Sequence, residues 1–228
     1  MKTHNIKHLA IIMDGNARWA FNKGIPKSEG HKIGAELIKN LVPNFIELNI
    51  PYVTLYSFSS ENWQRPKIEV SFLLKLLSFY LKKELDALHK NGVKIKVIGK
   101  LELLNTTLQQ QIRKATELTK GNDKLTLCIA FSYGSRSEIV NACQKIIDSG
   151  KKEIDENDFK NYLYDPEMPD VDLLIRTSGV LRISNFLLWQ AAYAELYFSP
   201  KYWPDFTKSD IIEALEDYSK RKRSFGGR

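Results

Sequence analysis

A lone carboxylate followed by an arginine stands directly after an apolar run near the N-terminus. The run ends at Met13, and Asp14, Gly15, Asn16 and Arg18 follow it. A carboxylate can hold a hard cation, while glycine amides and arginine can bind phosphate oxygens. The same residue types also favour ordinary turns and helix caps, so the local spacing leaves both interpretations open. The later residues that favour an anion pocket are Trp19, Lys27 and His31.

A second polar cluster, far along the chain, repeats the anion-binding chemistry without an acid. It contains Arg176, Arg182, Ser184 and Asn185. The planar guanidinium suits paired hydrogen bonds to diphosphate oxygens, whereas the ordinary alternative is two weak surface salt bridges. The hydroxyl and the amide beside the arginines favour the anion. Together with the first cluster, they suggest an enzyme that handles two diphosphate groups.

The segment 57–66 combines hydroxyls, an amide and an arginine with two aromatic residues. One interpretation is a polar loop in which Ser60 or Asn62 caps the next helix. The other is a pocket that Arg65 lines and that Phe58 and Trp63 wall. The two aromatic residues favour the pocket, because a plain loop seldom needs both.

One further carboxylate, Glu195, lies in an apolar stretch. A carboxylate in such surroundings needs a cation or a basic side chain, and structural pairing is the more frequent outcome. The chain has neither a GxxxxGK[ST] nor a GxGxxG sequence. It therefore lacks the usual loops of P-loop and Rossmann nucleotide enzymes.

Composition places the chain among ordinary globular proteins. Its 228 residues are 43% hydrophobic and 27% charged, enough for one substantial core, so we expect a single domain over 1–228. The net charge of +7 suits anionic partners, and part of the excess lies in a basic tail at about 220–228. Only Cys128 and Cys143 occur, and two buried thiols in a reducing cytoplasm are expected.

Strand-like and helix-like patterns alternate along the chain, which predicts a mostly parallel central sheet of about six strands flanked by helices. The expected strands span 8–13, 52–58, 93–98, 125–131, 171–175 and 195–198. The expected helices span 30–48, 67–91, 105–119, 135–149, 155–164 and 208–222. Helix 67–91 carries more apolar residues than one face needs, so it is either buried on both sides or lines an apolar cavity.

As a set, these motifs resemble the cis-prenyltransferases, also called undecaprenyl diphosphate synthases. The resemblance covers nearly the whole chain, from about 8 to 227. It depends on segments that occur in the family's order, namely 8–20, 30–31, 57–66, 176–190 and 193–206.

The resemblance implies that isopentenyl diphosphate is added repeatedly to farnesyl diphosphate with cis double bonds, in an apolar tunnel. The product would be a long-chain polyprenyl (undecaprenyl) diphosphate, the precursor of the lipid carrier for bacterial cell-wall synthesis. It assigns catalysis to Asp14 and Asn62, and Mg2+ binding to Asp14 and Glu195. The implied substrate-binding residues are Gly15, Asn16, Ala17, Arg18, Trp19, Lys27, His31, Ser59, Ser60, Glu61, Trp63, Arg65, Arg176, Arg182, Ile183 and Ser184.

Three positions depart from the family's usual residues. Ala17 replaces a glycine, which we expect to restrict the turn's backbone. Lys27 replaces an arginine, so it keeps the positive charge but lacks the planar guanidinium that donates paired hydrogen bonds. Val180 replaces a glutamate, so the ion pair that orients Arg182 is missing and the affinity for isopentenyl diphosphate is expected to fall.

The family resemblance also implies a homodimer in the cytoplasm, with a peripheral membrane contact at the inner face for product release. Two alternatives remain. One is a catalytically weak subunit of a two-chain cis-prenyltransferase, which the intact Asp14 disfavours. The other is a basic RNA- or membrane-binding module relying on the 220–223 tail. We expect no nucleic-acid partner, because no strand interleaves aromatic and basic residues.

Overall fold

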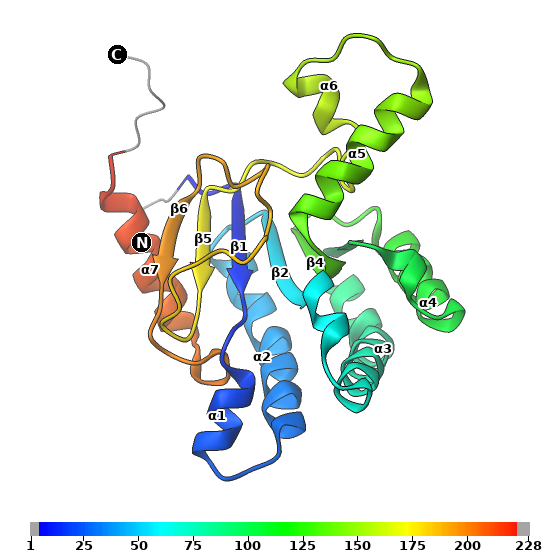
Figure 1. The fold of residues 1–228 in the computed structure, drawn as a ribbon. Coiled ribbons are helices and arrows are strands. Elements are labelled where there is room, and N and C mark those ends of the chain that lie inside the picture. The colour runs from blue at the N-terminus through cyan, green and yellow to red at the C-terminus, as the bar shows by residue number, and fades with distance from the viewer. Residues whose placement is uncertain (1–4, 223–228) are drawn as a thin grey trace.

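The computed structural model describes residues 5–222 and has the α/β architecture that the sequence predicts (Figure 1). The strands are β1 (His8–Ile12), β2 (Tyr52–Ser59), β3 (Val93–Ile98), β4 (Leu125–Tyr133), β5 (Leu173–Arg176) and β6 (Glu195–Phe198). The helices are α1 (Asn16–Asn22), α2 (Lys27–Glu47), α3 (Lys67–Lys90), α4 (Thr106–Thr119), α5 (Ser135–Ser149), α6 (Glu156–Lys160) and α7 (Lys208–Lys220). Short 3-10 helices are η1 (Ser60–Gln64), η2 (Leu101–Leu103) and η3 (Trp203–Asp205). Most of the expected basic tail, 223–228, lies outside the described residues.

All strand pairs in the sheet are parallel, and the strand order is β3-β4-β2-β1-β5-β6. This confirms the predicted fold class. Parallel neighbours need long crossover connections, which contain helices except between β5 and β6, where the segment 177–194 has none. The central strand β1 has β2 on one side and β5 on the other, so successive connections leave it in opposite directions. At such a switch point, a crevice opens beyond the carboxyl ends of the strands.

The two faces of the sheet follow the period-2 alternation of its strands. On β1, Leu9 and Ile11 pack in the core that contains α2 and α7. Ala10 and Ile12 face the opposite way, into a core completed by residues 168–187. All four side chains are buried. A strand buried on both faces explains why β1 is an uninterrupted apolar run.

Helices α2 and α3, which flank the site, begin after prolines and follow the apolar periodicity closely. Pro26 and Pro66 precede their first residues, and a proline at a helix start loses no hydrogen bond. Helix α3 ends just before Gly92, whose φ of 75° favours glycine. No helix in the described part of the chain is long and apolar enough to cross a membrane.

Several boundaries and two single-residue expectations differ from the structure. Helix α1 was not predicted, α2 begins at 27 rather than 30, and α6 covers 156–160 rather than 155–164. The thiol of Cys143 is exposed, not buried. The expectation for Ala17 is also wrong, because it lies inside α1, where alanine is favourable, and the positive φ of 106° falls on Gly15.

Candidate active site

The adjacency of β1 and β5 brings together residues that are far apart in the sequence. The Cα partner of Ile12 on β1 is Arg176 on β5. Asp14 follows β1 by two residues, so its carboxylate meets the Arg176 guanidinium at the switch point. Gly15 makes the sharp turn into α1, and a side chain there would collide with the ring of Tyr202. The pairing of β1 with β5 thus places Asp14 and Arg176 together at the carboxyl edge of the sheet.

The Asp14 carboxylate lies between two guanidinium groups. Its Oδ2 accepts a hydrogen bond from Nη2 of Arg176 at 2.9 Å, and its Oδ1 lies 3.1 Å from Nη2 of Arg18. Burial acts to raise the pKa of Asp14, but the hydrogen bond from Arg176 and the charge of Arg18 outweigh it and hold that pKa below its ordinary value. The carboxylate is therefore ionised at neutral pH and becomes protonated only in more acidic solution.

Thr177, a residue that sequence analysis missed, fixes the backbone of Asp14. Its Oγ1 accepts from the Asp14 N–H at 2.9 Å and donates to the Asp14 carbonyl at 2.7 Å. Thr177 is fully buried. The only feature of the sequence that could have identified Thr177 as a site residue was its position directly after a strand. The pairing of β1 with β5, which brings it to Asp14, cannot be read from local sequence.

Arg176 connects Asp14 to the loop that follows β5. Its Nη1 donates to the Arg182 carbonyl and to Oγ of Ser184, the latter at 2.6 Å. The residue is only 5% exposed, and its Nε has no hydrogen-bond partner among the described residues. Ser184 and Asn185 both adopt positive φ values, of 49° and 62°, which turn the loop back toward the sheet.

The segment after β2 forms η1 instead of a free loop. A capping box joins Ser59 and Asn62, in which Asn62 Oδ1 accepts from the Ser59 N–H at 3.1 Å. Glu61 accepts a hydrogen bond from Asn185 at 3.1 Å, which links η1 to the loop after β5. The structure therefore combines both sequence interpretations, because the capping residue also lines the cleft described below.

His31 and Arg65 meet at the same carboxylate, Glu69, which sequence analysis also missed. Arg65 Nη1 lies 2.9 Å from Glu69 Oε1, and His31 Nε2 lies 3.9 Å from it. Burial and the charge of Arg65 lower the pKa of His31, although Glu69 opposes this. A neutral His31 at pH 7 follows. The four-residue spacing of Arg65 and Glu69 was the signal that could have found this acid.

Most of these residues line one polar cleft of about 620 Å³. The structure brings together most of the predicted site residues there, namely Asp14, Gly15, Asn16, Ala17, Arg18, Lys27, His31, Ser59, Glu61, Asn62, Arg65, Arg176 and Ser184. Tyr56, not predicted, also lines it. A group of basic side chains around a cleft suits a polyanionic ligand such as a diphosphate.

An apolar cavity of about 270 Å³ adjoins the cleft and lies between α2, α3 and the sheet. Its lining includes Ile38, Leu77, Leu81 and Leu127, while Met13, Asn16, His31, Tyr56, Ser57 and Leu73 line both spaces. Of the extra apolar residues of helix 67–91, Leu76 and Tyr80 line this cavity, whereas Phe72 packs against a core and Phe79 is exposed, so the cavity interpretation holds in part. A polar cleft joined to an apolar cavity fits an amphipathic ligand with a charged head and a hydrocarbon tail.

Five predicted substrate-binding residues do not line the cleft. Trp19 donates through Nε1 to Asp205 at 2.8 Å, and Trp63 donates to Ser132 at 2.9 Å. Ser60 lies close to Gly134, and Ile183 packs against the core cluster that contains Ala10 and Ile12. Arg182 is exposed. Arg18, not Arg182, is the second guanidinium beside Asp14.

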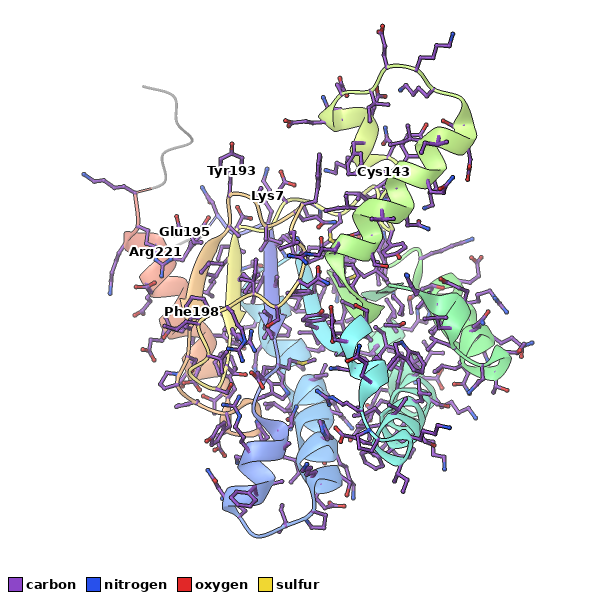
Figure 2. The ribbon with its side chains drawn as sticks, viewed as in Figure 1. Lys7, Cys143, Tyr193, Glu195, Phe198 and Arg221 are labelled. Atoms are coloured by element: carbon purple, nitrogen blue, oxygen red, sulfur yellow. The ribbon has the colours of Figure 1, made fainter. Side chains whose placement is uncertain are left out.

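The structure does not bring Glu195 to Asp14 within one chain. Glu195 begins β6 at the opposite end of the sheet, where its Cα pairs with Leu173 and its Oε2 lies 2.8 Å from Nη1 of Arg221 (Figure 2). It therefore has the basic partner that its apolar surroundings require.

The donor set at Asp14 fits a metal that the substrate helps to hold. Among the described residues, no group of three or more His, Cys, Asp or Glu side chains could bind a metal ion. Mg2+, however, is typically bound by one or two carboxylates together with substrate phosphates and water. A single carboxylate beside a diphosphate-sized basic cleft matches that mode.

Comparison with known proteins agrees with this geometry. A family model described as putative undecaprenyl diphosphate synthase matches residues 12–226. An isoprenyl transferase of Rickettsia felis is 74% identical over 224 residues, which cover 98% of this chain and 95% of that protein. The structure of lavandulyl diphosphate synthase from Lavandula x intermedia, in complex with dimethylallyl diphosphate, has a TM-score of 0.93 at 34% identity, over 97% of this chain and 98% of that one. A probable undecaprenyl diphosphate synthase from Campylobacter jejuni has a TM-score of 0.84 at 36% identity, over 98% and 99%.

The fold and the joined polar and apolar spaces define a transferase that acts on prenyl diphosphates. The chain belongs to the undecaprenyl diphosphate synthase family, the cis-prenyltransferases. The family resemblance that the motifs indicate is thereby confirmed.

Proposed function

We propose that this enzyme condenses isopentenyl diphosphate repeatedly onto farnesyl diphosphate with cis double bonds. The observation that carries the proposal is the joint arrangement of the ionised Asp14, flanked by Arg18 and Arg176, and the apolar cavity behind it. The charged cleft matches the diphosphate heads and the cavity matches the hydrocarbon tail.

In each cycle the allylic C–O bond breaks and releases pyrophosphate, and the allylic carbon bonds to the terminal alkene carbon of isopentenyl diphosphate. Loss of one proton from that substrate then forms the new double bond. Gly15 to Arg18, Lys27 and Arg65 would hold the allylic diphosphate. Arg176 and Ser184, joined by Arg182 and Ile183 from the following loop, would hold isopentenyl diphosphate. Asn62, which Ser59 positions and which lines the same cleft as His31, would assist removal of the proton.

Asp14 would hold Mg2+ together with diphosphate oxygens. When bound, the ion would stabilise the negative charge that develops on the departing pyrophosphate. Arg18 and Arg176 add fixed positive charge at the same place, and the apolar cavity excludes water from the cationic or near-cationic allylic carbon. Glu195 pairs with Arg221 in this chain, so the geometry of one chain supports Asp14 alone as the protein ligand.

A long-chain product, undecaprenyl diphosphate for cell-wall synthesis, is the outcome we propose. The family description and the Campylobacter jejuni relative support it. The fold does not fix the product, since the Lavandula x intermedia neighbour is a lavandulyl diphosphate synthase. We further propose a cytoplasmic homodimer with a peripheral membrane contact for product release.

The test is chromatography of the products formed from farnesyl diphosphate and labelled isopentenyl diphosphate, with and without EDTA. We expect long-chain polyprenyl diphosphates that disappear with EDTA and return with excess Mg2+. A purified chain that is inactive alone but active with a second subunit would instead support the two-chain alternative. EDTA-resistant turnover would refute the role of the metal.

A further inference from the structure

A charged residue interrupts the apolar lining of the cavity, which continues along α3 past this residue to Leu88 and Asn91. Glu84 of α3 lines the cavity together with Leu81, Ala87 and Leu88. Its side chain is only 10% exposed. An ionised carboxylate in apolar surroundings is costly unless it is paired. Nothing in the site described above uses this residue.

Glu84 pairs across the gap between the two helices that enclose the cavity. Its Oε1 lies 3.2 Å from Nζ of Lys39 on α2, and Lys39 lines the same cavity. That oxygen accepts no hydrogen bond from any described residue, and the Lys39 side chain is 49% exposed. The protein thus satisfies the pair incompletely, and the half-exposed Lys39 side chain leaves the pair open to solvent on that side.

The pair lies far from the diphosphate cleft. Helix α3 carries Glu69 at the cleft and Glu84 fifteen residues later, a separation of about 22 Å along the helix axis. Between these levels, Tyr80 donates to the Lys32 carbonyl at 3.4 Å. A tail that grows from the cleft along α3 therefore meets hydrocarbon side chains first and an ion pair only at this depth.

We propose that the Lys39–Glu84 ion pair is a specificity-determining element that sets how far the growing hydrocarbon chain extends down the cavity. This rests on the proposed function. A chain end that reaches the pair must cover it and remove its residual water, and desolvating an ion pair is costly unless it is fully hydrogen-bonded. Each earlier isoprene unit gains apolar burial. When the hydrocarbon chain extends past the pair, the cost of desolvating the pair offsets the free energy gained from apolar burial. Elongation therefore stops at this depth.

The first measurement is independent of turnover. Binding of decyl, hexadecyl and docosyl phosphate is measured by calorimetry for the wild-type protein and for Glu84→Leu. We expect decyl phosphate to bind both proteins within about twofold, and docosyl phosphate to bind Glu84→Leu about fivefold or more tightly than wild type. Affinities that rise equally with chain length in both proteins would overturn the proposal.

The second measurement is the product-length distribution from farnesyl and isopentenyl diphosphates. We expect Glu84→Leu to shift it toward products longer by at least one isoprene unit, and Glu84→Gln, which keeps size and polarity without charge, to shift it less. The matched control is Asp86→Leu, an exposed acid of the same helix that does not line the cavity. An equal shift in the control, or none in Glu84→Leu, would contradict the proposal.

The two measurements separate this inference from the proposed function. If neither protein makes product but the alkyl phosphates still distinguish Glu84→Leu from wild type, the proposed reaction fails while the role of the pair in the cavity holds. If products form but neither assay shows an effect of Glu84, the proposed reaction holds and the role of the ion pair in the cavity fails. Thermal melting checks that each variant is folded, and Glu84→Gln replaces Glu84→Leu in the binding series if the latter is not.

Discussion

Replacing Arg176 by lysine tests whether the planar fork of this residue, rather than its charge alone, organises the site. The guanidinium donates in two directions, to Asp14 through Nη2 and to Ser184 and the Arg182 carbonyl through Nη1. A lysine ammonium keeps the charge but cannot reach both sets of acceptors from one point. Arg176→Lys therefore separates charge from geometry.

The expected magnitude follows from these contacts. Hydrogen bonds that involve charged groups contribute about 1.5–3 kcal/mol each. Lysine retains one set of contacts, so we expect a loss of about 3 kcal/mol in transition-state stabilisation, or roughly 150-fold in kcat/KM. Most of the loss should appear for isopentenyl diphosphate, because the Ser184 side of the fork is the part assigned to that substrate.

The assay is incorporation of labelled isopentenyl diphosphate, with thermal melting as a check on folding. Arg113→Lys, an exposed arginine of α4, is the matched control and should leave kcat/KM unchanged. A folded Arg176→Lys enzyme that retains kcat/KM within about threefold of wild type would refute the reasoning. It would mean that a positive charge at this place is sufficient.

Two further predictions concern the same cleft. Asp14→Ala should abolish incorporation of labelled isopentenyl diphosphate while circular dichroism shows a retained fold, and measurable turnover would remove Asp14 from the role proposed for it. Val180→Glu should lower the apparent KM for isopentenyl diphosphate by giving the exposed Arg182 a carboxylate partner, and steady-state kinetics that show an unchanged KM would count against this explanation of Val180.

The sequence predicted the parts of the fold that depend on local patterns. The alternation of apolar runs predicted six strands and a parallel sheet, because a strand buried on both faces reads as a continuous apolar segment. Helix α1 escaped prediction for a local reason. It has seven residues and no side-chain cap, and a glycine with positive φ precedes its first residue, so its sequence resembles a turn.

The composition of the site was predicted better than its internal geometry. Residue types identified both polar clusters, and the structure places most members of each in one cleft. The meeting of Arg176 with Asp14, and the distance of the Arg182 side chain from them, were not predictable, because they depend on the register Ile12 to Arg176 and on the path of the loop after β5. That register positions Arg176 beside Asp14, and the loop uses the Arg182 backbone, not its side chain, to hold Arg176. Arg18 reaches Asp14 locally, from four residues along the chain.

The place of Glu195 decides how a metal could be held in a single chain. Arg176 pairs with Phe198 at the carboxyl end of β6, and Glu195 lies three residues earlier, about 10 Å along the strand. Asp14 is then the one carboxylate of the predicted metal pair at the cleft, and its oxygens already contact Arg18 and Arg176. One carboxylate so engaged is a poor metal site alone. In the proposed reaction a diphosphate would supply further oxygen ligands, so we expect the metal and the substrate to bind together.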